Sequence, residues 1–175
     1  MELEVGWVEA TGRERSMKIL AIDPGNIESA YVIMDDDYKP LESGKIPNNE
    51  LLTIVESTDA KRVVIEMVAS YGMAVGKEVF ETCVWIGRFY EVARSSECAY
   101  IERIYRKDVK MNLCGQTRAK DGNVIQALID RFAYGVPNKG KGSKKEPGWF
   151  YGFAADIWQA YALGVTYLDN IKRIQ

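Results

Sequence analysis

Histidine is absent from this 175-residue sequence, and its absence removes several kinds of catalytic site. Without histidine the chain cannot form a Ser-His-Asp triad, a Cys-His pair or a histidine-containing zinc site. Acid–base or metal chemistry must therefore use Asp, Glu, Lys, Tyr, Cys or water. Oxygen ligands favour Mg²⁺ or Mn²⁺, so we expect any metal used here to be one of these two ions.

Cysteines and long apolar runs are also scarce. Cys83, Cys98 and Cys114 are widely spaced and odd in number, which fits neither a zinc motif nor a disulfide framework and favours a reducing cytoplasm. No run approaches the roughly 20 apolar residues that a membrane helix needs. The polar N-terminus does not resemble a signal peptide. We expect a cytoplasmic protein with a disordered extension at residues 1–16 and a single domain at residues 17–175.

The charge is unevenly distributed along the chain. A formal net charge of −2 argues against general affinity for nucleic acids, but the basic residues gather in two patches. The first contains Arg103, Arg106, Lys107, Lys110, Arg118 and Lys120, with Asp108 as its one acid. The second contains Lys139, Lys141, Lys144 and Lys145 in a Gly-rich stretch. Such patches can follow a phosphate backbone, and a solvated lysine surface is the alternative for each.

Apolar runs and turn signals predict an α/β domain that begins with three strands, continues with a helix, a strand, a helix and a strand, and ends in helices. Strands are expected at 18–23, 29–34, 41–46, 61–66 and 99–105. Helices are expected at 48–57, with Asn48 or Asn49 as the cap, and at 75–95, 106–113, 120–132 and 152–171. The first strand should pair antiparallel with the second and parallel with the fourth, which follows a helical crossover. The prediction is a five-stranded mixed sheet of order 3-2-1-4-5 flanked by helices.

Two acidic residues lie at the ends of buried strands. Asp23 follows Ile19-Leu20-Ala21-Ile22, and Glu66 follows Val63-Val64-Ile65. Parallel neighbours end at the same edge of a sheet, where α/β proteins place ligands, so we expect the two carboxylates side by side. Close carboxylates repel each other unless they share a cation or a proton, and this favours a metal.

A third acid lies in the predicted final helix. Asp156 shares a helix face with Ala160, Leu163 and Tyr167, and this apolar face should pack on the sheet. The carboxylate would then point toward the sheet, although backbone amides of the first helical turn could satisfy it instead. Together with Asp23 and Glu66 it predicts a metal-binding cluster.

Three short motifs appear in a fixed order along the chain. They are Ile22-Asp23-Pro24-Gly25, Val64-Ile65-Glu66 and Ala154-Ala155-Asp156, with Val109-Lys110 and Ala119-Lys120 between the last two. In this order they resemble the RuvC family of Holliday-junction endonucleases, within the ribonuclease H-like superfamily. The sequence is most similar to the phage-encoded RuvC-like branch, from about Met17 to about Leu168.

The resemblance implies a dimeric, Mg²⁺-dependent crossover junction endodeoxyribonuclease of DNA recombination and repair, with Mn²⁺ able to substitute. Such an enzyme nicks two opposing strands of a four-way junction by in-line attack of water on a phosphodiester. By this resemblance Asp23, Glu66 and Asp156 hold the metal, and Lys110 or Lys120 stabilises charge on the phosphate. The residues expected to contact DNA are Arg106, Lys107, Arg118, Lys139, Lys141, Lys144, Lys145 and Tyr71.

Two positions depart from the family pattern. Phe153 stands three residues before Asp156, where the family usually has a second acid. A second metal would then be held weakly, by water, by the phosphate or by Asp121. Ala69 stands where bacterial members carry an aromatic wedge. Tyr71 or Met73 is expected to substitute, and Tyr71 is favoured because stacking on a base needs a flat face.

Other functions remain open at this point. The same chemistry could act more broadly on flaps and forks, or the loss of an acid at Phe153 could leave a catalytically weak ribonuclease H-like DNA-binding module. An actin-like ATPase or sugar kinase shares the opening topology. That function is disfavoured because Asp23-Pro24-Gly25-Asn26 is not a Gly-rich phosphate loop.

Overall fold

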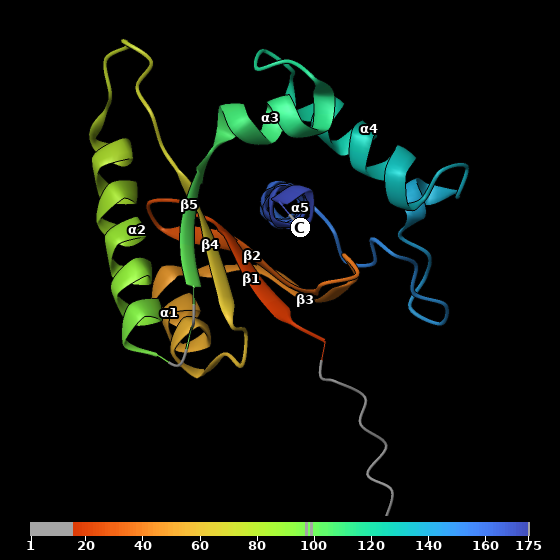
Figure 1. Ribbon diagram of the computed structural model, residues 1–175, viewed down its shortest axis with the longest axis horizontal. Helices are drawn as coiled ribbons and strands as arrows, with labels where there is room; N and C mark the ends of the chain where they lie inside the picture. Colours follow the sequence, from red (N-terminus) through yellow and green to blue (C-terminus); the bar gives the residue numbers. More distant parts are fainter. Residues whose placement is uncertain (1–15, 97, 99, 175) are drawn as a thin grey trace, which may run out of the picture.

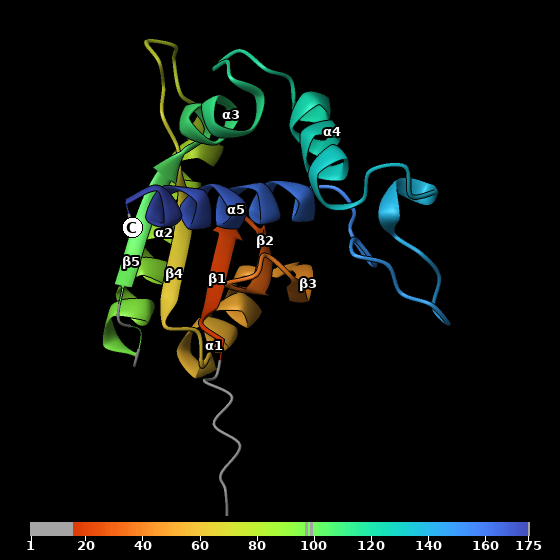
Figure 2. The same cartoon turned by 45° about the vertical axis from the view of Figure 1, so that its right-hand side comes forward.

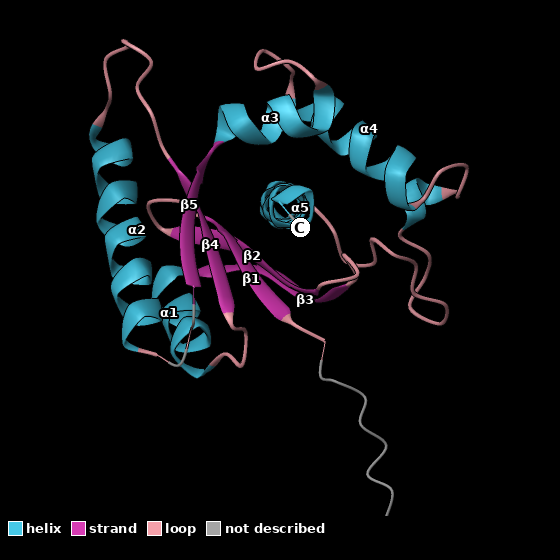
Figure 3. Ribbon diagram, in the orientation of Figure 1, coloured by secondary structure: helices cyan, strands magenta, loops and turns pink. Residues whose placement is uncertain are grey.

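The computed structural model describes residues 16–96, 98 and 100–174, so all but the last residue of the predicted extension at 1–16 lies outside the described residues. Figures 1 and 3 show the elements in chain order. The strands are β1 (Lys18–Asp23), β2 (Glu28–Asp35), β3 (Pro40–Pro47), β4 (Arg62–Met67) and β5 (Tyr100–Tyr105). The α-helices are α1 (Asn48–Ser57), α2 (Lys77–Ser95), α3 (Arg106–Cys114), α4 (Asp121–Phe132) and α5 (Ile157–Ile174), and a 3-10 helix, η1, covers Asn138–Gly140.

The five strands form one mixed sheet of order β3-β2-β1-β4-β5. Strand β2 pairs antiparallel with both β1 and β3, whereas β4 pairs parallel with β1 and with β5. The parallel pairs require crossovers, which α1 and α2 supply. This arrangement confirms the predicted fold and strand order.

Helices cover both faces of the sheet. Helices α1 and α2 lie on one face, and α5 lies on the other with α3 and α4 beyond it (Figure 1). Residues of β1 alternate between the two cores: Ile19 and Ala21 pack on the α5 side, whereas Leu20 and Ile22 pack on the α1–α2 side. Burial on both faces explains why β1 is an unbroken apolar run.

Helix α5 runs across the strands rather than along them (Figure 2). Its residues from Ile157 to Leu168 are all buried. At Gly164 an added Cβ would lie 2.5 Å from Met34 Sδ and 3.2 Å from Ala21 Cβ, so the glycine permits close approach of helix and sheet. Despite this burial, no helix in the described part of the chain has the length and apolar character needed to cross a membrane.

The start of α5 differs from the prediction, because the helix begins at Ile157 rather than at residue 152. Phe150 and Phe153 are buried in the core, and their rings contact each other edge to face. The chain turns repeatedly between them and α5, with Ala155 at φ 42°. A regular helix from residue 152 is replaced by a segment that places both rings in the core.

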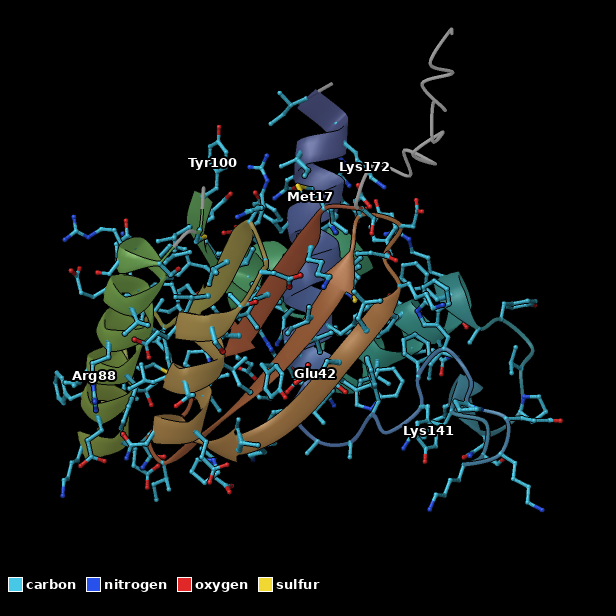
Figure 4. All side chains as sticks on the ribbon, turned by 90° about the horizontal axis from the view of Figure 1, so that it is seen from below. Met17, Glu42, Arg88, Tyr100, Lys141 and Lys172 are labelled. Atoms are coloured by element: carbon cyan, nitrogen blue, oxygen red, sulfur yellow. The ribbon has the colours of Figure 1, made fainter. Side chains whose placement is uncertain are left out.

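The Gly-rich segment 135–149, which carries the second basic patch, is folded back on itself. Backbone hydrogen bonds run from Gly148 N to Lys141 O and from Phe150 N to Gly140 O, each 3.0 Å long. A Cβ at Gly148 would lie 2.2 Å from Gly140 O, so this crossing requires glycine. The segment carries Lys141 on a projection beyond the sheet (Figure 4).

Candidate metal centre and its basic surroundings

A buried hydrogen-bond network fixes the turn that follows Asp23. Gly25 N–H donates to Ser29 Oγ at 3.0 Å, Ser29 Oγ donates to Asn48 Oδ1 at 2.6 Å, and Asn48 Nδ2 donates to Gly25 O at 2.9 Å. The prediction that Asn48 or Asn49 caps the first helix is wrong, because Pro47 holds the N-cap position and no side chain caps it. The Asn48 amide instead joins the start of α1 to the backbone beside Asp23.

The register of the sheet places three charged residues in one row. Asp23 is paired with Ala30, and Ala30 is paired with Lys45 on β3. On the other side, the pairing of Ile22 with Ile65 brings Glu66 next to Asp23. Directly paired residues share a face of a sheet, so all three side chains are on the face covered by α5.

Asp156 reaches this row from the opposite layer. It directly precedes α5, and its carbonyl accepts hydrogen bonds from Gln159 and Ala160, both 3.0 Å long. Its side-chain Oδ2 lies 2.6 Å from Lys45 Nζ. The carboxylate therefore contacts a side chain of the sheet. The prediction that Asp156 lies within the final helix is wrong, because α5 begins at Ile157.

Glu66 forms a second ion pair, with Arg106. Arg106, the first residue of α3, donates through Nη1 to Glu66 Oε2 at 3.0 Å and through Nη2 to Asp121 Oδ1 at 2.9 Å. Lys110, one turn further along α3, has its Nζ 3.6 Å from Asp121 Oδ1. One guanidinium thus bridges two carboxylates, and a lysine stands beside the second.

Asp23 is the carboxylate without such compensation. Within the described residues it has no hydrogen bond or ion pair from its side chain. Burial, and then the nearby charge of Glu66, raise the pKa of Asp23 well above its usual range, while Arg106 acts in the opposite direction. Burial likewise raises the pKa of Glu66 against the effect of Arg106. A cation beside Asp23 would relieve this cost.

The donor atoms fit a hard cation such as Mg²⁺ or Mn²⁺, because all of them are carboxylate oxygens. As they stand, however, no three acidic or cysteine side chains in the described residues are gathered closely enough to hold one ion. In this arrangement Asp156 is paired with Lys45, and Glu66 is paired with Arg106.

Phe153 contributes packing where the family pattern expects an acid. Its side chain is 1% exposed, and its ring contacts those of Phe150, Trp158 and Tyr161. Asp121 is the additional acid near the row, since its charge also acts to raise the pKa of Asp23. The hydrogen bond from Arg106 holds the pKa of Asp121 itself below its usual value against the effect of burial.

The predicted basic residues divide into two groups. Arg106 and Lys110 lie at the acidic row, whereas the side chains of Lys107, Arg118 and Lys120 are exposed around α3 and the start of α4. The second patch lies on the segment after α4, on the opposite side of the molecule from α2 (Figure 1). Lys139, Lys144 and Lys145 are exposed there, and Lys141 is half-buried.

Tyr71 lies on the connection between β4 and α2, which rises beyond the sheet (Figure 1). Its side chain is 59% exposed. The backbone has φ 48° at Tyr71 and φ 81° at Gly72, so a tight left-handed turn presents the ring. Because β4 carries Glu66 near its end, this connection leaves the sheet at the edge that carries the acids.

One residue of the site, Lys45, is not predicted from the sequence, because its position depends on the register of β2 and β3. Gln159 lies in the first turn of α5, and its Oε1 is buried without a hydrogen-bond partner within the described residues.

The fold is similar to that of solved Holliday-junction resolvases. Thermus thermophilus RuvC matches with a TM-score of 0.65 and 13% identity, over 90% of this chain and 96% of that chain. The same enzyme in complex with a Holliday junction substrate matches with a TM-score of 0.64 and 12% identity, over the same shares. Fowlpox virus resolvase in complex with substrate Holliday junction DNA matches with a TM-score of 0.55 and 15% identity, over 87% and 99%.

These likenesses show that the chain has the RuvC-like form of the ribonuclease H-like fold. No protein-family model matches the sequence, and no curated protein sequence matches it.

Proposed function

We propose that this protein is a metal-dependent, structure-selective endodeoxyribonuclease that resolves four-way DNA junctions. The observation that carries the proposal is the position of Asp23, Glu66 and Asp156, from the ends of two strands and the residue before α5, at one edge of the sheet. The chemistry belongs to the site, and the likeness to two resolvases that bind Holliday junctions supports the choice of substrate.

Asp23, Glu66 and Asp156 would together hold Mg²⁺, with Mn²⁺ as a substitute. When bound, the metal would supply activation of water and stabilisation of the charge on the leaving oxygen. Asp23 is the central ligand in this proposal because it lies between the other two acids and has no cation of its own.

The basic residues around the acids would bind and orient the DNA. Lys110, which lies beside Asp121, would stabilise negative charge on the attacked phosphate. Lys107, Arg118 and Lys120 would follow the neighbouring backbone, and the second patch would contact a DNA arm through salt-sensitive contacts. The exposed Tyr71 ring would stack on a base opened at the junction centre.

Helix α2 offers a surface for a two-fold dimer, which a pair of opposed nicks would require. Phe80 and Val84 on this helix are 61% and 63% exposed, and Gly87 lies one turn further along the same stripe. An added Cβ at Gly87 would meet nothing within 4 Å, so the glycine leaves room for another helix. A symmetric contact along this stripe would bury the apolar side chains.

The test is cleavage of an end-labelled synthetic four-way junction by purified protein with Mg²⁺, Mn²⁺ or EDTA. We expect paired nicks in opposing strands that require metal and that fall at least 100-fold in Asp23→Asn, because the central carboxylate is lost. Asp37→Asn is the matched control, since Asp37 lies in the exposed turn between β2 and β3.

Parallel reactions on a fork and on plain duplex DNA test the substrate class. Cleavage confined to the junction supports resolution, whereas equal cleavage of the fork would broaden the activity to branched DNA. Junction binding with no metal-dependent cleavage would overturn the nuclease proposal and leave a DNA-binding module.

A further inference from the structure

Two ion pairs within the chain neutralise carboxylates of the acidic site. Lys45 Nζ contacts Asp156 at 2.6 Å, and Arg106 contacts Glu66 at 3.0 Å while holding Asp121 at 2.9 Å. Both cations come from elements that carry none of the three acids, β3 and α3. They occupy oxygens of the outer two carboxylates, whereas Asp23 has no ion pair within the described residues.

The two pairs differ in how easily they open. The Lys45 and Asp156 side chains are 39% and 48% exposed, so this pair is screened by water and contributes little to stability. The Arg106 and Glu66 side chains are only 22% and 14% exposed, and leaving Glu66 unpaired there would be costly. Arg106 can nevertheless release Glu66 without losing every partner, because its Nη2 remains on Asp121.

We propose that Lys45 and Arg106 are built-in counter-cations of the site that exchange carboxylate oxygens for DNA phosphate oxygens when substrate binds. The proposal rests on the proposed nuclease function and concerns the order in which its parts assemble. A phosphate that takes up Lys45 and Arg106 frees Asp156 and Glu66 for the metal, so DNA and metal strengthen each other's binding. By linkage this effect is reciprocal.

Metal binding to the DNA-free protein tests the first half of the exchange. We expect Arg106→Gln and Lys45→Met to bind Mn²⁺ about tenfold more tightly than the unmodified protein in calorimetric titrations, because the ion no longer competes with a side chain. Circular dichroism verifies that each variant is folded. Lys45→Met provides an independent answer if Arg106→Gln is unstable, since the Lys45 side chain is more exposed than that of Arg106.

Lys110→Met separates competition for ligand oxygens from a general change in charge. Lys110 lies 3.6 Å from Asp121 and forms no ion pair with Glu66, Asp23 or Asp156 in the described residues. Competition predicts less than a twofold change in Mn²⁺ affinity for Lys110→Met. An equal gain in all three variants, or no gain in Arg106→Gln and Lys45→Met, would overturn the proposal.

Junction binding in EDTA tests the second half. We expect Arg106→Gln and Lys45→Met to bind the junction several-fold more weakly in fluorescence anisotropy, whereas Lys39→Met, in the exposed turn before β3, binds normally. Unchanged junction affinity in both site variants would overturn the exchange.

The outcome can be told apart from failure of the proposed function. Tighter Mn²⁺ binding with weaker junction binding in a protein that cuts nothing would support the exchange and overturn the nuclease. Metal-dependent cleavage with unchanged Mn²⁺ affinities in the variants would support the nuclease and overturn the exchange.

Discussion

The rings of Phe153 and Tyr161 meet edge to face, with centroids 5.3 Å apart and planes at 75°. Tyr161 is fully buried, and its hydroxyl donates to Tyr38 O at 2.8 Å while accepting from Trp149 Nε1 at 3.0 Å. Phe153 is thus one member of an aromatic core, in which its ring contacts those of Phe150, Trp158 and Tyr161. Phenylalanine at this position therefore stabilises the core, in addition to removing one possible metal ligand.

Restoring an acid at this position is expected to damage the core. In Phe153→Asp the carboxylate would be buried among rings, and we expect a loss of roughly 3–5 kcal/mol in the free energy of unfolding. Urea unfolding followed by circular dichroism measures it, with Phe153→Leu as a control that loses less. Equal stability of the Asp variant, or a gain in Mn²⁺ affinity, would show that the side chain can reach the metal site.

Glycine at position 164 is expected to be required for close packing of α5. In Gly164→Ala the new Cβ would collide with Met34 Sδ and crowd Ala21, and we expect a loss of roughly 1–3 kcal/mol in thermal or urea unfolding. Gly87→Ala is the matched helical control and should gain about 0.5–1 kcal/mol in the monomer. If Gly87→Ala dissociates the dimer, light scattering would report a lower average molar mass, and this result would place Gly87 in the interface.

Asp169 is expected to make stability depend on acid pH. It accepts two hydrogen bonds from Arg131, one from Asn112 and one from Tyr38, all 2.8 Å long. Burial opposes ionisation, but these donors hold the pKa of Asp169 below its usual value. A lowered folded pKa contributes stability above the unfolded pKa of about 4, and this contribution disappears as the pH falls through the folded value.

The measurement for Asp169 is urea unfolding of Asp169→Asn at two pH values. We expect the variant to be less stable by roughly 2 kcal/mol at pH 7, because charge-assisted hydrogen bonds are lost. The difference from the unmodified protein should shrink at pH 2 to 3. A difference that is the same at both pH values would show that the ionised carboxylate is not the source.

The basic segment after α4 is expected to contribute affinity without sequence preference. Replacing Lys139, Lys144 and Lys145 together by Ala should weaken binding to junctions of different sequence about equally. The slope of log affinity against log salt should fall by roughly one for each lysine that contacts a phosphate. The same three positions changed to Arg keep the charge and serve as the control. An unchanged salt slope in the Ala variant would make this patch a solvated surface.

The acids on the strands could be predicted from the sequence because their positions depend on local signals. Apolar runs locate β1 and β4, and a helical crossover makes the two strands parallel, which brings Asp23 beside Glu66. Asp156 was selected from helical spacing, but it lies just before α5, which begins at Ile157. The N-cap prediction for Asn48 was wrong because the contacts of this side chain are not local. Its partners, Ser29 and Gly25, come from a turn that is distant in the sequence.

The cations of the site could not be predicted in the same way. The position of Lys45 depends on the register between β2 and β3, which shifts by an irregularity between Ile33 and Met34 that periodicity does not reveal. Arg106 was assigned to DNA contact from charge alone, whereas its contacts with Glu66 and Asp121 depend on how α3 leaves β5. Such long-range placements are decided by packing.

Helix α5 follows all five strands in the chain, although it forms the core of one face of the sheet. On the ribosome the strands therefore emerge while that face still lacks its cover, and Asp156 arrives only with the helix that completes the fold. A nascent chain that has not reached Asp156 has two of the three acids and an uncovered apolar surface. During synthesis, the arrival of α5 therefore covers the exposed face of the sheet and adds the third acid in the same late step.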